Sequence, residues 1–76
     1  MDMRRLVGRN VNRIRQEKGL TQERLAELSG FSQQYISGLE QDRRNPTIVS
    51  LYELATALGV SYMELMRLTG EEQANP

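Results

Sequence analysis

The side chains best suited to specific hydrogen bonding lie within residues 32–41, where they recur at helical spacing. Gln33, Gln34 and Ser37 are polar but uncharged, and Gly38 has no side chain. A glutamine amide presents a donor beside an acceptor, so it can pair bidentately with the adenine edge in a DNA major groove. Serine can serve most bases, and glycine permits close approach to the groove floor. Taken alone, however, two glutamines are more typical of an ordinary first helical turn.

The composition excludes most enzymatic chemistry. The 76 residues contain no Cys and no His, so disulfides, thiolate or imidazole metal sites, Ser-His-Asp triads and Cys-His pairs are excluded. The length predicts one small domain, and 38% hydrophobic with 26% charged residues is a globular composition. We therefore expect no enzymatic activity, no cofactor and no small-molecule ligand.

The chain also lacks the signals of membrane targeting. No apolar run approaches the roughly 20 residues of a bilayer span, and the N-terminus lacks the apolar core of a signal peptide. The sequence therefore predicts a cytoplasmic protein with no membrane partner.

Two short helices joined by a tight turn are predicted over residues 21–40. Thr21 and Ser32 are good N-cap residues, and each stands between the two apolar residues of a hydrophobic staple. Gly30 suits the turn between the helices, because glycine adopts left-handed conformations without strain. The apolar residues expected on the facing sides of the two helices are Leu25, Ala26, Leu28, Ile36 and Leu39.

This helix pair gives the polar residues a second interpretation. An ordinary solvated helix face more often carries Glu and Lys pairs. At the start of the second helix of such a pair, base readout is therefore the better hypothesis. The residues predicted to contact bases are Ser32, Gln33, Gln34, Ser37 and Gly38.

Several spaced elements, covering roughly residues 6–68, occur together in one known family. They are Gly19 to Ala26, Ser29 to Ser32, Ile36-Ser37, Leu39-Glu40, Arg44 to Pro46, Leu54-Ala55 and Ala57 to Ser61. In these elements the sequence closely resembles the Cro and phage-repressor (XRE) type helix-turn-helix family. The resemblance implies an all-α, compact five-helix, lambda-repressor-like DNA-binding domain with the helix-turn-helix at its second and third helices. It also implies a homodimer that binds double-stranded DNA at a palindromic operator.

One departure from the family lies at the end of the second motif helix. Many members have Gly or Asn-Gly after the glutamate at position 40, whereas this chain has Gln41 and Asp42. Asp tolerates the left-handed region better than most residues do. The exit from this helix is nevertheless expected to lack the easy left-handed turn that glycine provides.

The pattern of caps, apolar stripes and breakers predicts one domain over residues 1–69 and a flexible polar tail over 70–76. The expected helices span residues 4–18, 22–29, 33–41, 48–58 and 62–69.

Phosphate contacts are expected on both sides of the base contacts. Although the net charge is zero, residues 1–45 hold nine Lys or Arg against six Asp or Glu, and the remaining residues hold one against four. The half that carries the helix pair is thus +3 and the other half is −3, which would orient the protein on a duplex. Arg43 and Arg44 are well placed for phosphates, and one of them could enter the narrow minor groove. The full set predicted to contact phosphates is Thr21, Gln22, Gln41, Arg43, Arg44 and Asn45.

The resemblance also implies a structural ion pair. Family members commonly pair an arginine of the first helix with the glutamate that ends the recognition helix, and the matching residues here are Arg15 and Glu40. The alternative is an exposed pair worth less than about 1 kcal/mol.

The last predicted helix is apolar around most of its circumference. One side should complete the core, and the surplus predicts an interface with a second copy of the chain. Tyr62, Met63 and Met66 are the residues expected in that interface. The alternative is that all of them cover the open end of a small core.

These observations predict a sequence-specific transcriptional regulator, more specifically a repressor that binds an inverted repeat as a homodimer. A second hypothesis is an antitoxin or adaptor whose main partner is another, unidentified protein.

Overall fold

The computed structural model describes residues 2–68, and this part of the chain is all-helical, as predicted. The five helices are α1 (Met3–Glu17), α2 (Gln22–Ser29), α3 (Gln33–Glu40), α4 (Ile48–Leu58) and α5 (Tyr62–Leu65). None of the described helices is long and apolar enough to cross a membrane.

Local side-chain caps begin every helix. Thr21, Ser32 and Thr47 each accept a hydrogen bond from the backbone amide three residues later, and Ser61 accepts one from the amide two residues later. Gly30 ends α2 in the left-handed conformation, with φ of 84°. The exit from α3 has the same feature two residues after the helix, since Asp42 has φ of 64°.

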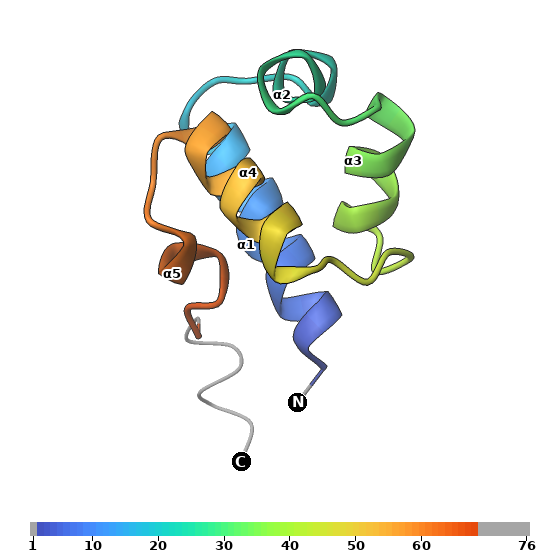
Figure 1. The fold of residues 1–76 in the computed structure, drawn as a ribbon, viewed down its shortest axis with the longest axis vertical. Coiled ribbons are helices and arrows are strands. Elements are labelled where there is room, and N and C mark those ends of the chain that lie inside the picture. The colour runs from blue at the N-terminus through green and yellow to red at the C-terminus, as the bar shows by residue number, and fades with distance from the viewer. Residues whose placement is uncertain (1, 69–76) are drawn as a thin grey trace.

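The helices, arranged as in Figure 1, pack around one small core of buried apolar side chains. α1 packs against α3, α4 and α5, while α2 packs against both α3 and α4. The helix pair α2 and α3 therefore sits on a platform made by α1 and α4. The fully buried large apolar side chains of this core are Leu6, Val11, Leu25, Ile36, Leu39, Leu54 and Leu65.

α1 and α3 approach each other closely at Gly8. A Cβ atom on Gly8 would stand 2.3 Å from the backbone carbonyl oxygen of Leu39, far inside any normal contact. Only glycine can occupy this position without moving the two helices apart. Nothing in the sequence around Gly8 indicates this close approach.

One apolar prediction in α2 is wrong. Leu28 was expected on the packed side of the helix but is 44% exposed. The inward stripe of α2 runs through Gln22, Leu25, Ala26 and Ser29, and at about 100° per residue Leu28 lies roughly 110° from its centre.

The fifth helix is shorter than predicted, because it ends at Leu65 rather than at residue 69. The buried Asn10 side chain donates to the carbonyl oxygens of Leu65 and Arg67, at 2.9 and 2.8 Å. These bonds satisfy the carbonyl of the last residue of α5 and that of Arg67, and they fix the chain against α1. Residue 69 and the predicted tail lie outside the described residues.

Candidate nucleic-acid interface

The outer side of α3 is a polar stripe. Gln34, Ser37, Gly38 and Gln41 recur at intervals of three or four residues and so share one side of the helix. Gln33 and Gln34 are exposed in its first turn, after the Ser32 cap. The Nε2 of Gln41 donates to Ser37 Oγ at 3.3 Å, so the Gln41 side chain lies along this stripe. A phosphate ligand was expected at the flank of the helix instead.

The stripe and the two arginines that follow it line one open hollow of about 320 Å³. Its lining residues are Gln34, Ser37, Gly38, Gln41, Arg43 and Arg44. The structure thus brings together three residues predicted to contact bases and three predicted to contact phosphates.

Arg44 lies back across α3. Its Cζ atom is 5.7 Å from the centre of the Tyr35 ring, a cation–π contact. Its Cγ and Nε atoms lie 3.1 and 3.2 Å from the position that a Cβ on Gly38 would take. Tyr35 is itself stacked on Phe31, with ring centroids 4.6 Å apart. Tyr35 was not predicted to lie at this site, because nothing in the local sequence indicates a contact with a loop residue nine positions away.

The start of α2 offers backbone amides on a different element. Thr21 Oγ1 accepts from the Arg24 amide at 3.0 Å, and the first amides of the helix have no partner within it. The Gln22 side chain, however, is not turned outward as expected, since its Nε2 donates to Glu40 Oε1 at 2.9 Å. A phosphate at this end would therefore meet Thr21 and the backbone first.

The Glu40 carboxylate is the centre of a largely buried network that joins three helices. Arg15 Nε lies 2.8 Å from Glu40 Oε2, so the structure contains the ion pair implied by the resemblance. The Oε1 atom also accepts from Arg15 Nη2, Asn12 Nδ2 and Gln22 Nε2, at 3.1, 2.9 and 2.9 Å. The Glu40 side chain is only 4% exposed and that of Arg15 11%, so this is no surface pair.

This network sets the protonation of Glu40. Burial raises the pKa of the carboxyl. The hydrogen bonds from Arg15, Asn12 and Gln22 and the charge of Arg15 lower the pKa, and together they outweigh the effect of burial. The net pKa lies below its ordinary value of 4.5, which keeps Glu40 ionised at neutral pH.

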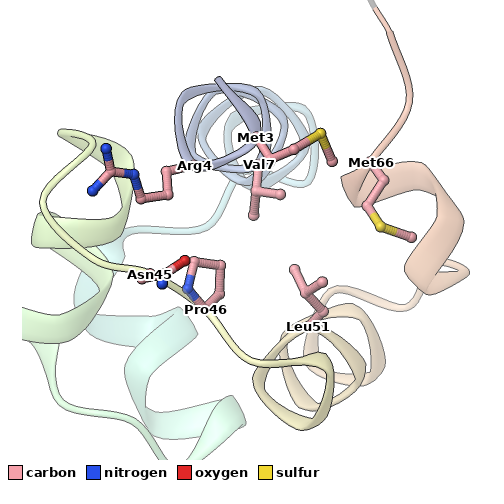
Figure 2. Close-up of a pocket in the computed structure, with 7 residues that line it drawn as sticks. All are labelled: Met3, Arg4, Val7, Asn45, Pro46, Leu51 and Met66. Carbon is pink, nitrogen blue, oxygen red and sulfur yellow. The ribbon is translucent and has the colours of Figure 1, made fainter. Parts of the chain in front are cut away.

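Asn45 lies apart from the other predicted phosphate ligands. It lines a smaller hollow of about 90 Å³ with Arg4 and with apolar side chains of α1, α4 and the segment after α5 (Figure 2). Met66 lines the same hollow and packs on the core, so it is less available to a partner than predicted. Asn45 does not line the hollow that holds Arg43 and Arg44.

Two sets of apolar side chains are exposed on the second half of the molecule. Tyr62 and Met63 of α5 are 49% and 66% exposed. The first turns of α4 add Ile48, Val49 and Tyr52, at 83%, 67% and 62%. The second set was not among the residues predicted for an interface, because helical periodicity identifies the buried stripe of α4 and not its exposed side.

Comparison with known proteins identifies the family. A helix-turn-helix family model matches residues 11–65. An uncharacterised HTH-type transcriptional regulator from Sinorhizobium fredii is 65% identical over 71 residues, which are 93% of this chain and 92% of that protein. The immunity repressor of Bacillus phage phi105 is 39% identical over 66 residues, covering 87% of this chain and 44% of the repressor.

A solved structure agrees with this assignment. The restriction-modification controller protein C.AhdI from Aeromonas hydrophila superposes with a TM-score of 0.79 at 40% identity, covering 82% of this chain and 94% of the controller. The chain described here therefore belongs to the XRE-type helix-turn-helix family of DNA-binding transcriptional regulators.

Proposed function

We propose that this regulator binds an inverted repeat in double-stranded DNA as a homodimer and represses transcription there. The observation that carries the proposal is the polar stripe of α3, which faces away from the core and is flanked by Arg43 and Arg44. A major groove admits one helix, and uncharged amide and hydroxyl groups suit the base edges in it. A relative that is named a repressor supports repression, rather than activation, of transcription.

The proposed contacts follow from where each side chain lies. Gln33, Gln34 and Ser37 would face base edges, with Ser32 and Gly38 close to the groove. Arg43 and the start of α2 at Thr21 would hold phosphates on either side. Gln22 acts indirectly, since it is bonded to Glu40 and fixes α2 against α3.

The proposed dimer uses the exposed apolar surface of α5. Tyr62 and Met63 are the main contacts, and Met66, which is partly buried against the core, is a minor one. Two copies related by a twofold axis would present their α3 helices to half-sites about 34 to 36 Å apart. Because α4 exposes a second apolar surface, Met63→Asp and Val49→Asp should be compared by analytical ultracentrifugation. We expect Met63→Asp to give monomers and Val49→Asp to remain dimeric.

The test of the function is selection of bound sequences from a random duplex library, followed by binding at two salt concentrations. An enriched inverted repeat with about one helical turn between half-site centres is the expected result. If no sequence is enriched and binding disappears at moderate salt, the proposal fails, and the hypothesis of an antitoxin or adaptor with a protein partner takes its place. We also propose that the protein is cytoplasmic, because its proposed target is DNA.

A further inference from the structure

Asn10 of α1 makes a bridge to the chain that follows α5. The residue is completely buried, and within residues 2–68 no other polar residue is buried to the same extent. Its Nδ2 atom donates to the carbonyl oxygens of Leu65 and Arg67, at 2.9 and 2.8 Å, so both hydrogens of the amide nitrogen are used. We call these two hydrogen bonds the Asn10 bridge.

Arg13 holds the Asn10 amide in the orientation that the bridge needs. Arg13 Nη2 donates to Asn10 Oδ1 at 3.0 Å, and this bond leaves the Nδ2 atom turned toward the two carbonyls. A cation bound to the amide oxygen also strengthens the amide nitrogen as a donor. The Arg13 side chain is 38% exposed, so the bridge is supported from the surface of α1.

The segment held by the bridge has little local stability of its own. α5 is a single turn of four residues, whereas an isolated helix in water needs roughly 12 to 15 residues. Leu65 is the buried residue of this turn, while Tyr62 and Met63 are exposed. Burial of Leu65 and the Asn10 bridge therefore hold the turn against α1.

α1 also carries the contacts that hold α3. Asn12 and Arg15 bind Glu40 at the end of α3, and Asn10 lies only two residues before Asn12. α1 packs against both α3 and α5 and lies between them (Figure 1). In a dimer formed through α5, the distance between the two α3 helices depends on where each α5 lies relative to its own α3. That relation is set by the two groups of contacts on α1.

We propose that Asn10 is a positioning residue for dimerisation, because it holds α5 in the conformation that presents Tyr62 and Met63 to a second copy of the chain. The inference rests on the proposed function, which assigns the dimer interface to α5. Without the bridge, the turn would have to be ordered when two copies meet. Ordering the backbone of one residue costs roughly a factor of ten in affinity. The bridge removes this cost before the copies meet, and through α1 it fixes the spacing of the two α3 helices.

The test compares Asn10→Asp with the matched control Asn12→Asp. Each variant replaces an amide donor of α1 with a carboxylate of the same shape, but only Asn10→Asp breaks the bridge. Analytical ultracentrifugation without DNA gives the dimer dissociation constant, and thermal unfolding of each variant reports its stability. We expect dimerisation to be at least about tenfold weaker for Asn10→Asp and unchanged for Asn12→Asp, although both variants should unfold at a lower temperature.

A second pair of variants leaves Asn10 in place and so provides a test even if Asn10→Asp does not fold. Arg13→Ala removes the donor to Asn10 Oδ1 and also the exposed ion pair with Glu17 at 3.5 Å, whereas Glu17→Ala removes the ion pair alone. We expect Arg13→Ala to weaken dimerisation by roughly two- to tenfold, the effect of one hydrogen bond. It should also speed hydrogen exchange of the Met66 amide. Glu17→Ala should leave both quantities unchanged.

Two outcomes would overturn the inference in distinguishable ways. If Met63→Asp abolishes the dimer but the Asn10 and Arg13 variants dimerise as their controls do, the role of Asn10 is wrong and the proposed dimer stands. If the wild-type protein stays monomeric both free and on its operator, the proposed dimer fails and the role of Asn10 fails with it.

Discussion

The two sides of α3 differ in how their polar groups are used. On the inner side, the Glu40 carboxylate accepts hydrogen bonds from Arg15, Asn12 and Gln22 and is almost completely buried. On the outer side, Gln33 and Gln34 are exposed, and Gln34 lines an open hollow. The inner side therefore fixes where the helix lies, and the outer side is available to a ligand. Changes on the inner side should affect folding, whereas changes on the outer side should affect DNA binding alone.

The largest expected effect comes from breaking the inner network. Glu40→Ala leaves the Arg15 guanidinium and two amide groups without their acceptor, so the free energy of unfolding should fall by about 3 to 5 kcal/mol. Chemical denaturation at neutral pH measures this change. The matched control is Glu27→Ala, which removes an exposed pair with Arg24 and should cost less than about 1 kcal/mol. Equal effects of the two changes would show that the network is no stronger than a surface pair.

The next largest loss of stability should come from a substitution that pushes α1 and α3 apart. Gly8→Ala places a Cβ against the Leu39 carbonyl oxygen, and because a backbone atom cannot turn aside, the cost should be near the upper end of about 1 to 3 kcal/mol. Gly38→Ala is the control, since its new Cβ meets only the Arg44 side chain and the helix gains up to about 1 kcal/mol of propensity. The midpoint temperature of thermal unfolding should be lower for Gly8→Ala than for the wild type. For Gly38→Ala it should be equal to that of the wild type or higher. The reverse order would contradict the assigned close approach.

The outer side should show the opposite behaviour. Gln34→Ala removes an exposed amide, so the free energy of unfolding should change by less than about 0.5 kcal/mol. Binding to the selected operator should weaken by about 1 to 3 kcal/mol, with a relaxed base preference at one position. Equal losses on operator and random DNA would reject base readout by this residue. Fluorescence anisotropy with both duplexes measures the difference.

The smallest effect is the dependence of stability on pH. The pKa of Glu40 is lowered in the folded state, so its contribution is fully present above the ordinary value of 4.5 and is lost as the pH falls through the folded pKa. The difference in unfolding free energy between the wild type and Glu40→Gln should therefore be constant from pH 7 to about pH 5 and shrink below that. A difference that grows as the pH falls below 4.5 would mean that the pKa is raised instead.

The features that could be predicted from the sequence depend on contacts between residues close together in the chain. Helix starts depend on contacts within a few residues, and the caps at Thr21, Ser32, Thr47 and Ser61 were recognisable from residue type and spacing. The buried side of α4 could also be predicted, because its apolar residues recur with the period of a helix. The all-α five-helix fold could therefore be predicted from local patterns together with the family resemblance.

Contacts between distant residues could not be predicted from such patterns. Asn10 bonds to carbonyls more than 50 residues away and thereby ends α5, although an asparagine within a helix carries no local sign of this role. Gly8 is required only because α3 passes over it, and Gln22 turns inward only because Glu40 lies there. The Arg15–Glu40 pair was anticipated from the family resemblance, and no spacing rule predicts it.

The most direct test of the two-sided α3 is an NMR titration of the protein with its selected operator, following the side-chain amide signals of the glutamines. We predict that the Nε2 signals of Gln33, Gln34 and Gln41 shift strongly on binding. The signal of Gln22, which is bonded to Glu40 on the inner side, should shift little. Strong shifts at Gln22 with unchanged signals at Gln33 and Gln34 would contradict the assignment of the outer side of α3 to DNA.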